Sequence, residues 1–123
     1  MLSGERLLIV EEEFLIALDI QRVLEDANAQ KAVFARNFSE VASMGDQLGQ
    51  FDLAIVNPPK REPLDLAVAQ RIVASGVAVV VCSAFGKDLE GTPLATAEFV
   101  GKPFSDDTLL AACRRAIARR SRH

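Results

Sequence analysis

Short, largely apolar runs alternate with longer amphipathic segments along the chain, and this alternation constrains the fold more than any other feature. The runs lie at residues 6–10, 31–34, 53–56, 77–82 and 98–100. Runs of this length and composition are typical of strands buried on both faces of a parallel sheet. Apolar positions recur at helical spacing over residues 14–27 and 64–74, with polar side chains between them. The pattern therefore predicts five strands connected by helices.

Capping and breaking residues place the remaining elements. Ser39 is predicted to cap a short helix through about residue 48, and Ser105 to cap a last helix that ends in an arginine-rich turn. Residues 57–63 hold three prolines and are predicted to form a loop. Residues 85–96 hold two glycines and one proline, so any helix there is expected to be short or frayed.

Strands that alternate with helices indicate an α/β fold with an open parallel sheet covered on both faces. We expect a single doubly wound (βα)5 domain of the flavodoxin-like type, with strand order 2-1-3-4-5. The length of 123 residues fits one domain, so residues 1–123 are expected to hold no effector domain. Half of the residues are apolar and a quarter are charged, which is the balance of a globular domain with a true core.

Composition argues against several classes of function. A net charge of −3 disfavours a dedicated nucleic-acid binder. No apolar run approaches the roughly 18 residues that a membrane span needs, and the first ten residues lack a signal peptide. A cytoplasmic protein is therefore expected. Cys82 and Cys113 match no zinc-binding spacing and are expected to be buried, reduced thiols.

Polar residues follow the predicted strands at the points where functional groups gather in such sheets. Glu11 and Glu12 come after the first strand, Asn57 after the third, Ser83 after the fourth and Lys102 after the fifth. Carboxylates suit Mg²⁺, and a hydroxyl and an ammonium group stabilise phosphoryl oxygens. The pattern therefore predicts an acidic pocket at this end of the sheet.

From Arg6 to about Arg119 the chain resembles the receiver domain of bacterial two-component response regulators. Four segments in the right order carry the resemblance: residues 8–13 (LIVEEE), 51–57 (FDLAIVN), 80–84 (VVCSA) and 99–104 (FVGKPF). The resemblance implies that Glu11 and Glu12 match the acidic pair that binds Mg²⁺. It implies that Ser83 matches the residue that bonds the phosphoryl group, and that Lys102 contacts the phosphoryl group and its acceptor.

Two further positions matter for switching. Asn57 stands where the family has its phosphoacceptor aspartate, and Phe99 matches the aromatic switch residue. A carboxamide is a very poor nucleophile and is uncharged, so Mg²⁺ binding is expected to be weak at best. These departures indicate a degenerate receiver, or pseudo-receiver. Simpler interpretations stay open: a turn residue before proline for Asn57, a hydroxyl bonded to nearby backbone for Ser83, and core packing for Phe99.

Three functional hypotheses follow. The first is a stand-alone receiver-like domain in two-component or phosphorelay signalling that is not phosphorylated at the usual site. It would act by protein–protein contact, through the family's surface of fourth helix, fifth strand and fifth helix. Its partner would be a histidine kinase, a phosphotransfer protein or a downstream regulator, and a homodimer is an open alternative.

The second hypothesis is a receiver phosphorylated on another carboxylate, with Glu62 or Asp65 as loop candidates. The third is a metal-dependent enzyme using the acidic pocket, ranked last because the one histidine, His123, is terminal. The family's lysine–proline bond is usually cis. We therefore predict a cis Lys102–Pro103 bond, with the ammonium near Glu12 and the side-chain oxygen of Asn57.

Overall fold

Five parallel strands form one sheet in the computed structural model, which describes residues 2–86 and 88–120. The strands are β1 (Leu7–Val10), β2 (Ala32–Ala35), β3 (Leu53–Val56), β4 (Ala78–Ser83) and β5 (Glu98–Gly101). The helices are α1 (Phe14–Asp26), α2 (Phe38–Ala42), α3 (Pro63–Ala74) and α4 (Asp106–Arg120), with a 3-10 helix η1 at Gly45–Gln50. The strand order is β2-β1-β3-β4-β5, so the predicted flavodoxin-like order 2-1-3-4-5 is confirmed.

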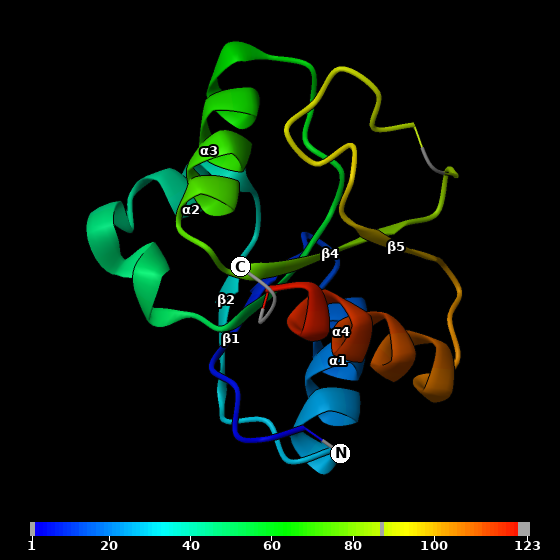
Figure 1. The fold of residues 1–123 in the computed structure, drawn as a ribbon. Helices are drawn as coiled ribbons and strands as arrows, with labels where there is room; N and C mark the ends of the chain where they lie inside the picture. Colours follow the sequence, from blue (N-terminus) through cyan, green and yellow to red (C-terminus); the bar gives the residue numbers. More distant parts are fainter. Residues whose placement is uncertain (1, 87, 121–123) are drawn as a thin grey trace.

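Helices cover both faces of the sheet (Figure 1). Helices α1 and α4 lie together on one face, and α2 and α3 lie on the other. Because successive strand residues point to opposite faces, Leu7 and Ile9 pack under α1 and α4, whereas Leu8 and Val10 pack under α2 and α3. Strands β1 and β3 are buried throughout, as their apolar runs predict.

The predicted helix at residues 39–48 is wrong in its extent. Helix α2 begins at Phe38 and ends at Ala42, and the residue that caps it is Asn37, whose Oδ1 accepts a hydrogen bond from the backbone N–H of Glu40 (2.9 Å). Gly45 has a φ of +58°, a left-handed conformation that interrupts a right-handed helix. The chain therefore continues as η1 rather than as one longer helix.

No helix forms between β4 and β5 in the part of the chain that is described. Residues 84–86 and 88–97 form turns and bends, with Gly86 and Gly91 at φ of +81° and +78°. Leu89 and Leu94 are buried in the core and fix this segment against the sheet. The weak helical pattern of residues 85–96 is thus explained by glycines that need left-handed backbone.

Helix α4 begins where its capping residue predicts. The hydroxyl oxygen of Ser105 accepts a hydrogen bond from the backbone N–H of Thr108 (3.1 Å), and Asp106 and Asp107 lie in the first turn. None of the helices in the described residues is long and apolar enough to cross a membrane.

Cys82 and Cys113 are both free and buried. Burial raises the pKa of Cys82 to about 11 and that of Cys113 to about 12. Both thiols therefore stay protonated near neutral pH, and neither has the character of a reactive cysteine.

Glu98 joins β5 to the last turns of α4. Its carboxylate accepts from Nε of Arg115 (2.5 Å) and from a terminal guanidinium nitrogen of Arg119 (3.0 Å). The hydrogen bond from Arg115 is the main cause that lowers the pKa of Glu98 below its ordinary value, and burial opposes it. A lowered folded-state pKa stabilises the fold above the unfolded pKa, and that contribution is lost as the pH falls through the folded value.

We expect Glu98→Gln to lower the free energy of unfolding by about 1 kcal/mol at pH 7, since both arginines are half exposed and water screens the pairs. The difference from wild type should shrink once the pH falls below the unfolded-state glutamate pKa of about 4.3 and then through the lowered folded-state pKa of Glu98. Urea unfolding across this pH range measures it. Glu90→Gln, at an exposed position, is the control and should follow the wild-type profile. A difference that persists unchanged at pH 3 would contradict the ionic origin.

Candidate functional site

Glu11 and Asn57 lie side by side at the carboxyl end of the sheet because their strands are neighbours. Val10 of β1 pairs with Val56 of β3; Glu11 directly follows the first and Asn57 the second. The backbone N–H of Glu11 donates to the carbonyl of Ala35 (3.0 Å), and that of Asn57 donates to the carbonyl of Val10 (3.0 Å). These bonds continue the parallel ladder by one residue and hold both side chains at the same edge.

Lys102 reaches this edge from β5. Its backbone N–H donates to the carbonyl of Ser83 (2.8 Å), so β5 stays paired with β4 up to the point where the chain turns. The Lys102–Pro103 peptide bond is cis, as predicted. The lysine side chain is largely buried, with 13% of it exposed.

Three side chains form a closed ring of hydrogen bonds at this edge. Lys102 Nζ donates to Glu11 Oε1 (2.5 Å) and to Asn57 Oδ1 (3.1 Å). Asn57 Nδ2 donates to Glu11 Oε2 (3.1 Å), which also accepts from the backbone N–H of Glu13 (3.0 Å). Both oxygens of the Glu11 carboxylate are therefore bonded within the protein.

The amide of Asn57 suits this ring because it offers a donor on one side and an acceptor on the other. The donor faces the Glu11 carboxylate, and the acceptor faces the Lys102 ammonium. An aspartate could supply the acceptor, but its second oxygen would face the carboxylate of Glu11. The ring as it stands holds one negative and one positive charge, so it is neutral and satisfied without a further ion.

One of the two predicted neighbours of the Lys102 ammonium, Glu12, is wrong. Lys102 contacts Glu11, whereas Glu12 is exposed and is not part of the ring. The reason is that Glu11 continues the β1 ladder and is buried, whereas the next residues leave the sheet and enter α1, where Glu13 is the N-cap. The predicted position of Lys102 near the Asn57 side-chain oxygen agrees with the structure.

The residues at this edge do not fit a Mg²⁺ ion. Mg²⁺ is held by carboxylate and other oxygen ligands in near-octahedral geometry. Here the buried carboxylate of Glu11 is bonded to an ammonium and to an amide N–H group, and the donor group of Asn57 points toward it. Within the described residues there is also no group of three or more His, Cys, Asp or Glu that could hold a metal.

Ser83 and Phe99 lie next to this edge without joining the ring. Ser83 is buried, and its Oγ accepts a hydrogen bond from the backbone N–H of Phe85 (3.1 Å). This bond agrees with the simpler interpretation of Ser83 as a hydroxyl bonded to nearby backbone. Phe99 is partly buried and packs against the core on the α2 and α3 side. Its packing suits a core residue, and its role as a switch stays a prediction.

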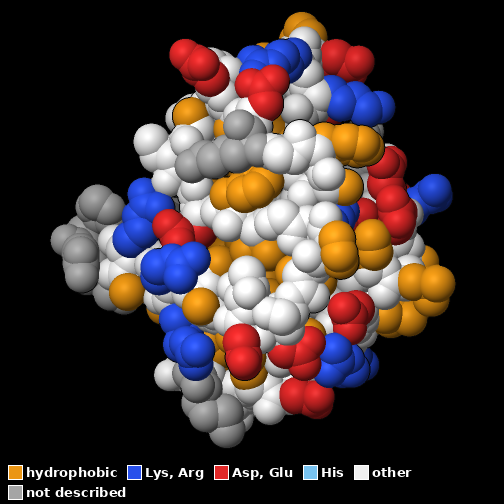
Figure 2. Space-filling view, turned by 90° about the vertical axis from the view of Figure 1, so that its right-hand side faces the viewer, with side chains coloured by type: hydrophobic (Ala, Val, Ile, Leu, Met, Phe, Trp, Pro, Cys, Tyr) orange, Lys and Arg blue, Asp and Glu red, His pale blue; other side chains and the backbone are white. Residues whose placement is uncertain are grey.

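Exposed apolar side chains follow β1 and β4 closely in the chain. Phe14 is 70% exposed and Leu15 is 80% exposed at the start of α1, and Phe85 is 95% exposed just after β4. Figure 2 looks onto this side of the molecule, where hydrophobic patches lie among acidic and basic side chains. Sequence reasoning missed this feature, although Phe14 and Leu15 follow the three glutamates directly.

Solved structures provide the comparison with known proteins, since the sequence matches no family model and no curated protein. A response regulator receiver domain from Clostridium thermocellum superposes with a TM-score of 0.73 at 22% identity, covering 95% of this chain and 97% of its own. The signal receiver domain of an HD domain-containing protein from Pseudomonas fluorescens gives 0.75 at 18% identity, covering 99% and 93%. The chain has the receiver-domain fold.

A chemotaxis protein of Vibrio cholerae, CheY4, is similar to the same extent, with a TM-score of 0.72 at 16% identity over 93% of this chain and 99% of that one. In each comparison nearly all of both chains is covered. The likeness therefore extends over nearly the whole chain.

Proposed function

We propose that this chain is a receiver-type domain of two-component or phosphorelay signalling that works without phosphorylation at position 57. The closed ring of Glu11, Asn57 and Lys102 carries the proposal. Asn57 lacks a nucleophilic carboxylate, and the amide is bonded to both neighbours. The receiver-domain fold supports the signalling class, and the sequence segments around the ring support the same assignment.

We further propose that the domain acts by binding another signalling protein: a histidine kinase, a phosphotransfer protein or a downstream regulator. With the ring closed, the domain has one resting state at this edge and presents a constant surface. The contact surface would include β5 and α4, together with the turns of residues 84–86 and 88–97, which replace the expected fourth helix.

The two carboxylates of the second hypothesis are weaker candidates for phosphorylation. Glu62 is exposed and precedes α3, and the carboxylate of Asp65 accepts from the backbone N–H of Lys60 (2.8 Å). Among the described residues, no hydrogen bond or ion pair joins either one to Lys102, whose ammonium would have to stabilise the phosphoryl oxygens.

Incubation of the wild-type protein with acetyl phosphate and Mg²⁺ should give no base-labile phosphoryl adduct, because position 57 offers no carboxylate. Intact-mass spectrometry measures the mass of one added phosphoryl group. A receiver domain with an aspartate at the corresponding position, treated in the same tube, is the positive control. Stoichiometric labelling of the wild type would contradict the proposal.

The site of any label decides between the two signalling hypotheses. Peptide mapping that places it on Glu62 or Asp65, and its loss in Glu62→Gln or Asp65→Asn, would support the second hypothesis. Capture of partners from a lysate of the source cell should yield the same signalling protein with and without acetyl phosphate. A partner that binds only with or only without acetyl phosphate would contradict the proposal that the binding surface is independent of phosphorylation.

A further inference from the structure

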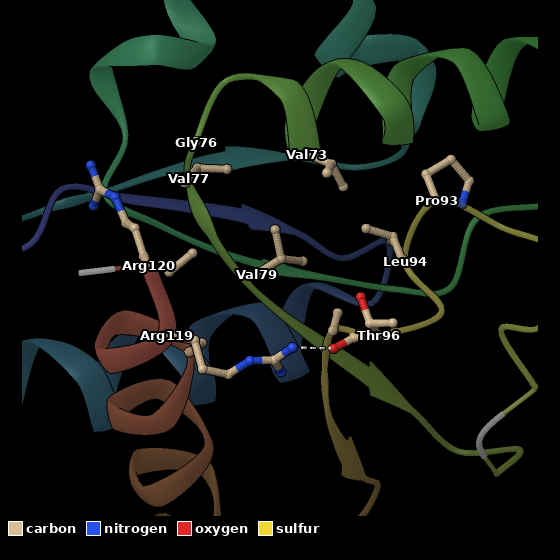
Figure 3. Close-up of a pocket in the computed structure, with 12 residues that line it drawn as sticks. Val73, Gly76, Val77, Val79, Pro93, Leu94, Thr96, Arg119 and Arg120 are labelled. Carbon is tan, nitrogen blue, oxygen red and sulfur yellow. Dashed lines mark hydrogen bonds between the residues drawn. The ribbon is translucent and has the colours of Figure 1, made fainter. Parts of the chain in front are cut away.

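A groove opens at the opposite end of the sheet from the ring, where β4 begins. Strand β4 starts at Ala78, but β5 first pairs with it at Val80. The first two residues of β4 therefore extend past the end of β5 and leave a notch in the sheet. The groove in this notch has a volume of about 500 Å³ (Figure 3). That volume lies in the range of small-molecule sites.

Apolar side chains from three parts of the chain line the groove. Val73 comes from the end of α3, Val77 directly precedes β4, Val79 is the second residue of β4, and Leu94 comes from the turns before β5. Val73 is 42% exposed, and Val79 is only partly buried although it lies on an interior strand. Val77 and Leu94 are buried, so Val73 and Val79 supply most of the exposed apolar surface of the groove.

Two arginines from the last turn of α4 stand at one side of the groove (Figure 3). Arg119 donates to the carbonyl of Thr96 (2.8 Å) and to Glu98, and Arg120 donates to the carbonyl of Asp52 (3.0 Å). A guanidinium has five N–H donors in a planar fork. These bonds use two nitrogens of Arg119 and one nitrogen of Arg120, so each retains N–H groups for a ligand.

Among the described residues, positive charges outnumber negative ones at this side of the groove. Two carboxylates, those of Asp52 and Glu98, are in contact with four guanidinium groups: Arg6, Arg115, Arg119 and Arg120. These six side chains therefore carry an excess of two positive charges beside an apolar groove. An apolar wall next to a guanidinium cluster with excess positive charge is complementary to a ligand with an apolar body and an anionic head.

We propose that this groove binds an amphiphilic carboxylate: a small molecule with a short aliphatic body and one carboxylate group. The aliphatic body lies against Val73 and Val79, and the carboxylate accepts hydrogen bonds from Arg119 and Arg120. A small molecule fits better than a protein segment because the notch is bounded by α3 on one side and α4 on the other. The proposal does not rest on the signalling function, since Asn57 lies at the other end of the sheet.

Methyl NMR of the full chain with valine and leucine methyl groups labelled tests the proposal, with octanoate as the probe. Octanoate should shift the methyl signals of Val73, Val77, Val79 and Leu94 in a saturable way. Acetate, which lacks the body, and octylammonium, which carries the opposite charge, should leave them in place. Added salt should weaken the octanoate effect, because partly exposed charges are screened.

Variants at the arginines give the decisive comparison. Arg119→Gln and Arg120→Gln should each weaken octanoate binding by about tenfold, the effect of removing one charge-assisted hydrogen bond. Arg114→Gln, an exposed arginine of the same helix outside the groove, should bind as the wild type does. Val73→Glu places a negative charge in the groove without disturbing the core and should abolish binding.

Three outcomes would overturn the proposal. One is the absence of saturable shifts at these four residues, and another is an equal response to octylammonium, which would indicate apolar adsorption alone. The third is that octanoate fails but a peptide with acidic and apolar residues shifts the same signals, which would assign the groove to a protein partner. The phosphorylation experiment is independent of all three.

Discussion

Lys102→Met is expected to lower the free energy of unfolding by about 3 kcal/mol, because it leaves a buried carboxylate without its counter-charge. The Glu11 side chain is 2% exposed, and Lys102 Nζ is the positive group that it contacts. Methionine keeps most of the aliphatic volume of lysine, so the change mainly removes the charge and its two hydrogen bonds. Urea unfolding at pH 7 measures the difference.

The double variant Glu11→Gln/Lys102→Met separates charge from packing. It should recover most of the loss, since a neutral side chain at position 11 needs no ammonium partner. Lys60→Met, at an exposed position, should leave stability within about 0.5 kcal/mol of wild type. If Lys102→Met were equally neutral, the ring would not hold in solution and the account of this edge would be wrong.

Asn57→Asp is expected to destabilise the fold by about 2 kcal/mol in the absence of divalent cations. The substitution exchanges the N–H donor that faces Glu11 for a carboxylate oxygen, so a hydrogen bond is lost and two like charges are brought together. Thermal or urea unfolding with a chelator present measures this effect. Mg²⁺ should restore part of the variant's stability, since a second carboxylate supplies an oxygen ligand.

The wild type should show no stabilisation by Mg²⁺ at the same concentration, because Glu11 is already bonded on both oxygens. Gln47→Glu adds one negative charge at an exposed position and controls for net charge; it should change stability little with or without Mg²⁺. A wild-type protein that gains more stability from Mg²⁺ than Asn57→Asp does would contradict the neutral ring.

Patterns of neighbouring residues were sufficient to predict most of the secondary structure. Apolar runs placed all five strands to within a residue or two, because a strand buried on both faces admits few polar side chains. Ser105 was predicted as a cap and acts as one, since capping depends on residues adjacent in sequence. The same reasoning failed at Ser39, because the helix begins one residue before it, at Phe38. Asn37 is therefore the N-cap, and its side chain accepts from the backbone N–H of Glu40.

The sequence by itself determined which chemical groups meet at the carboxyl edge of the sheet. Once the strands and their order are known, the residue after each strand is placed by connectivity, and Asn57 excludes an acyl phosphate at that position whatever the packing. The sequence also placed the cis bond at Lys102–Pro103 through family resemblance.

The tertiary structure alone decided the pairing within that edge and the shape of the opposite one. The choice of Glu11 over Glu12 depends on one further rung of the ladder between β1 and β2, which buries the first glutamate and leaves the second in solvent. The groove depends on the register of β5, which first pairs with the third residue of β4. It also depends on α4, whose last turn places Arg119 and Arg120 beside the groove. Both are offsets between segments far apart in sequence, and such offsets are set by packing between layers, to which local patterns are insensitive.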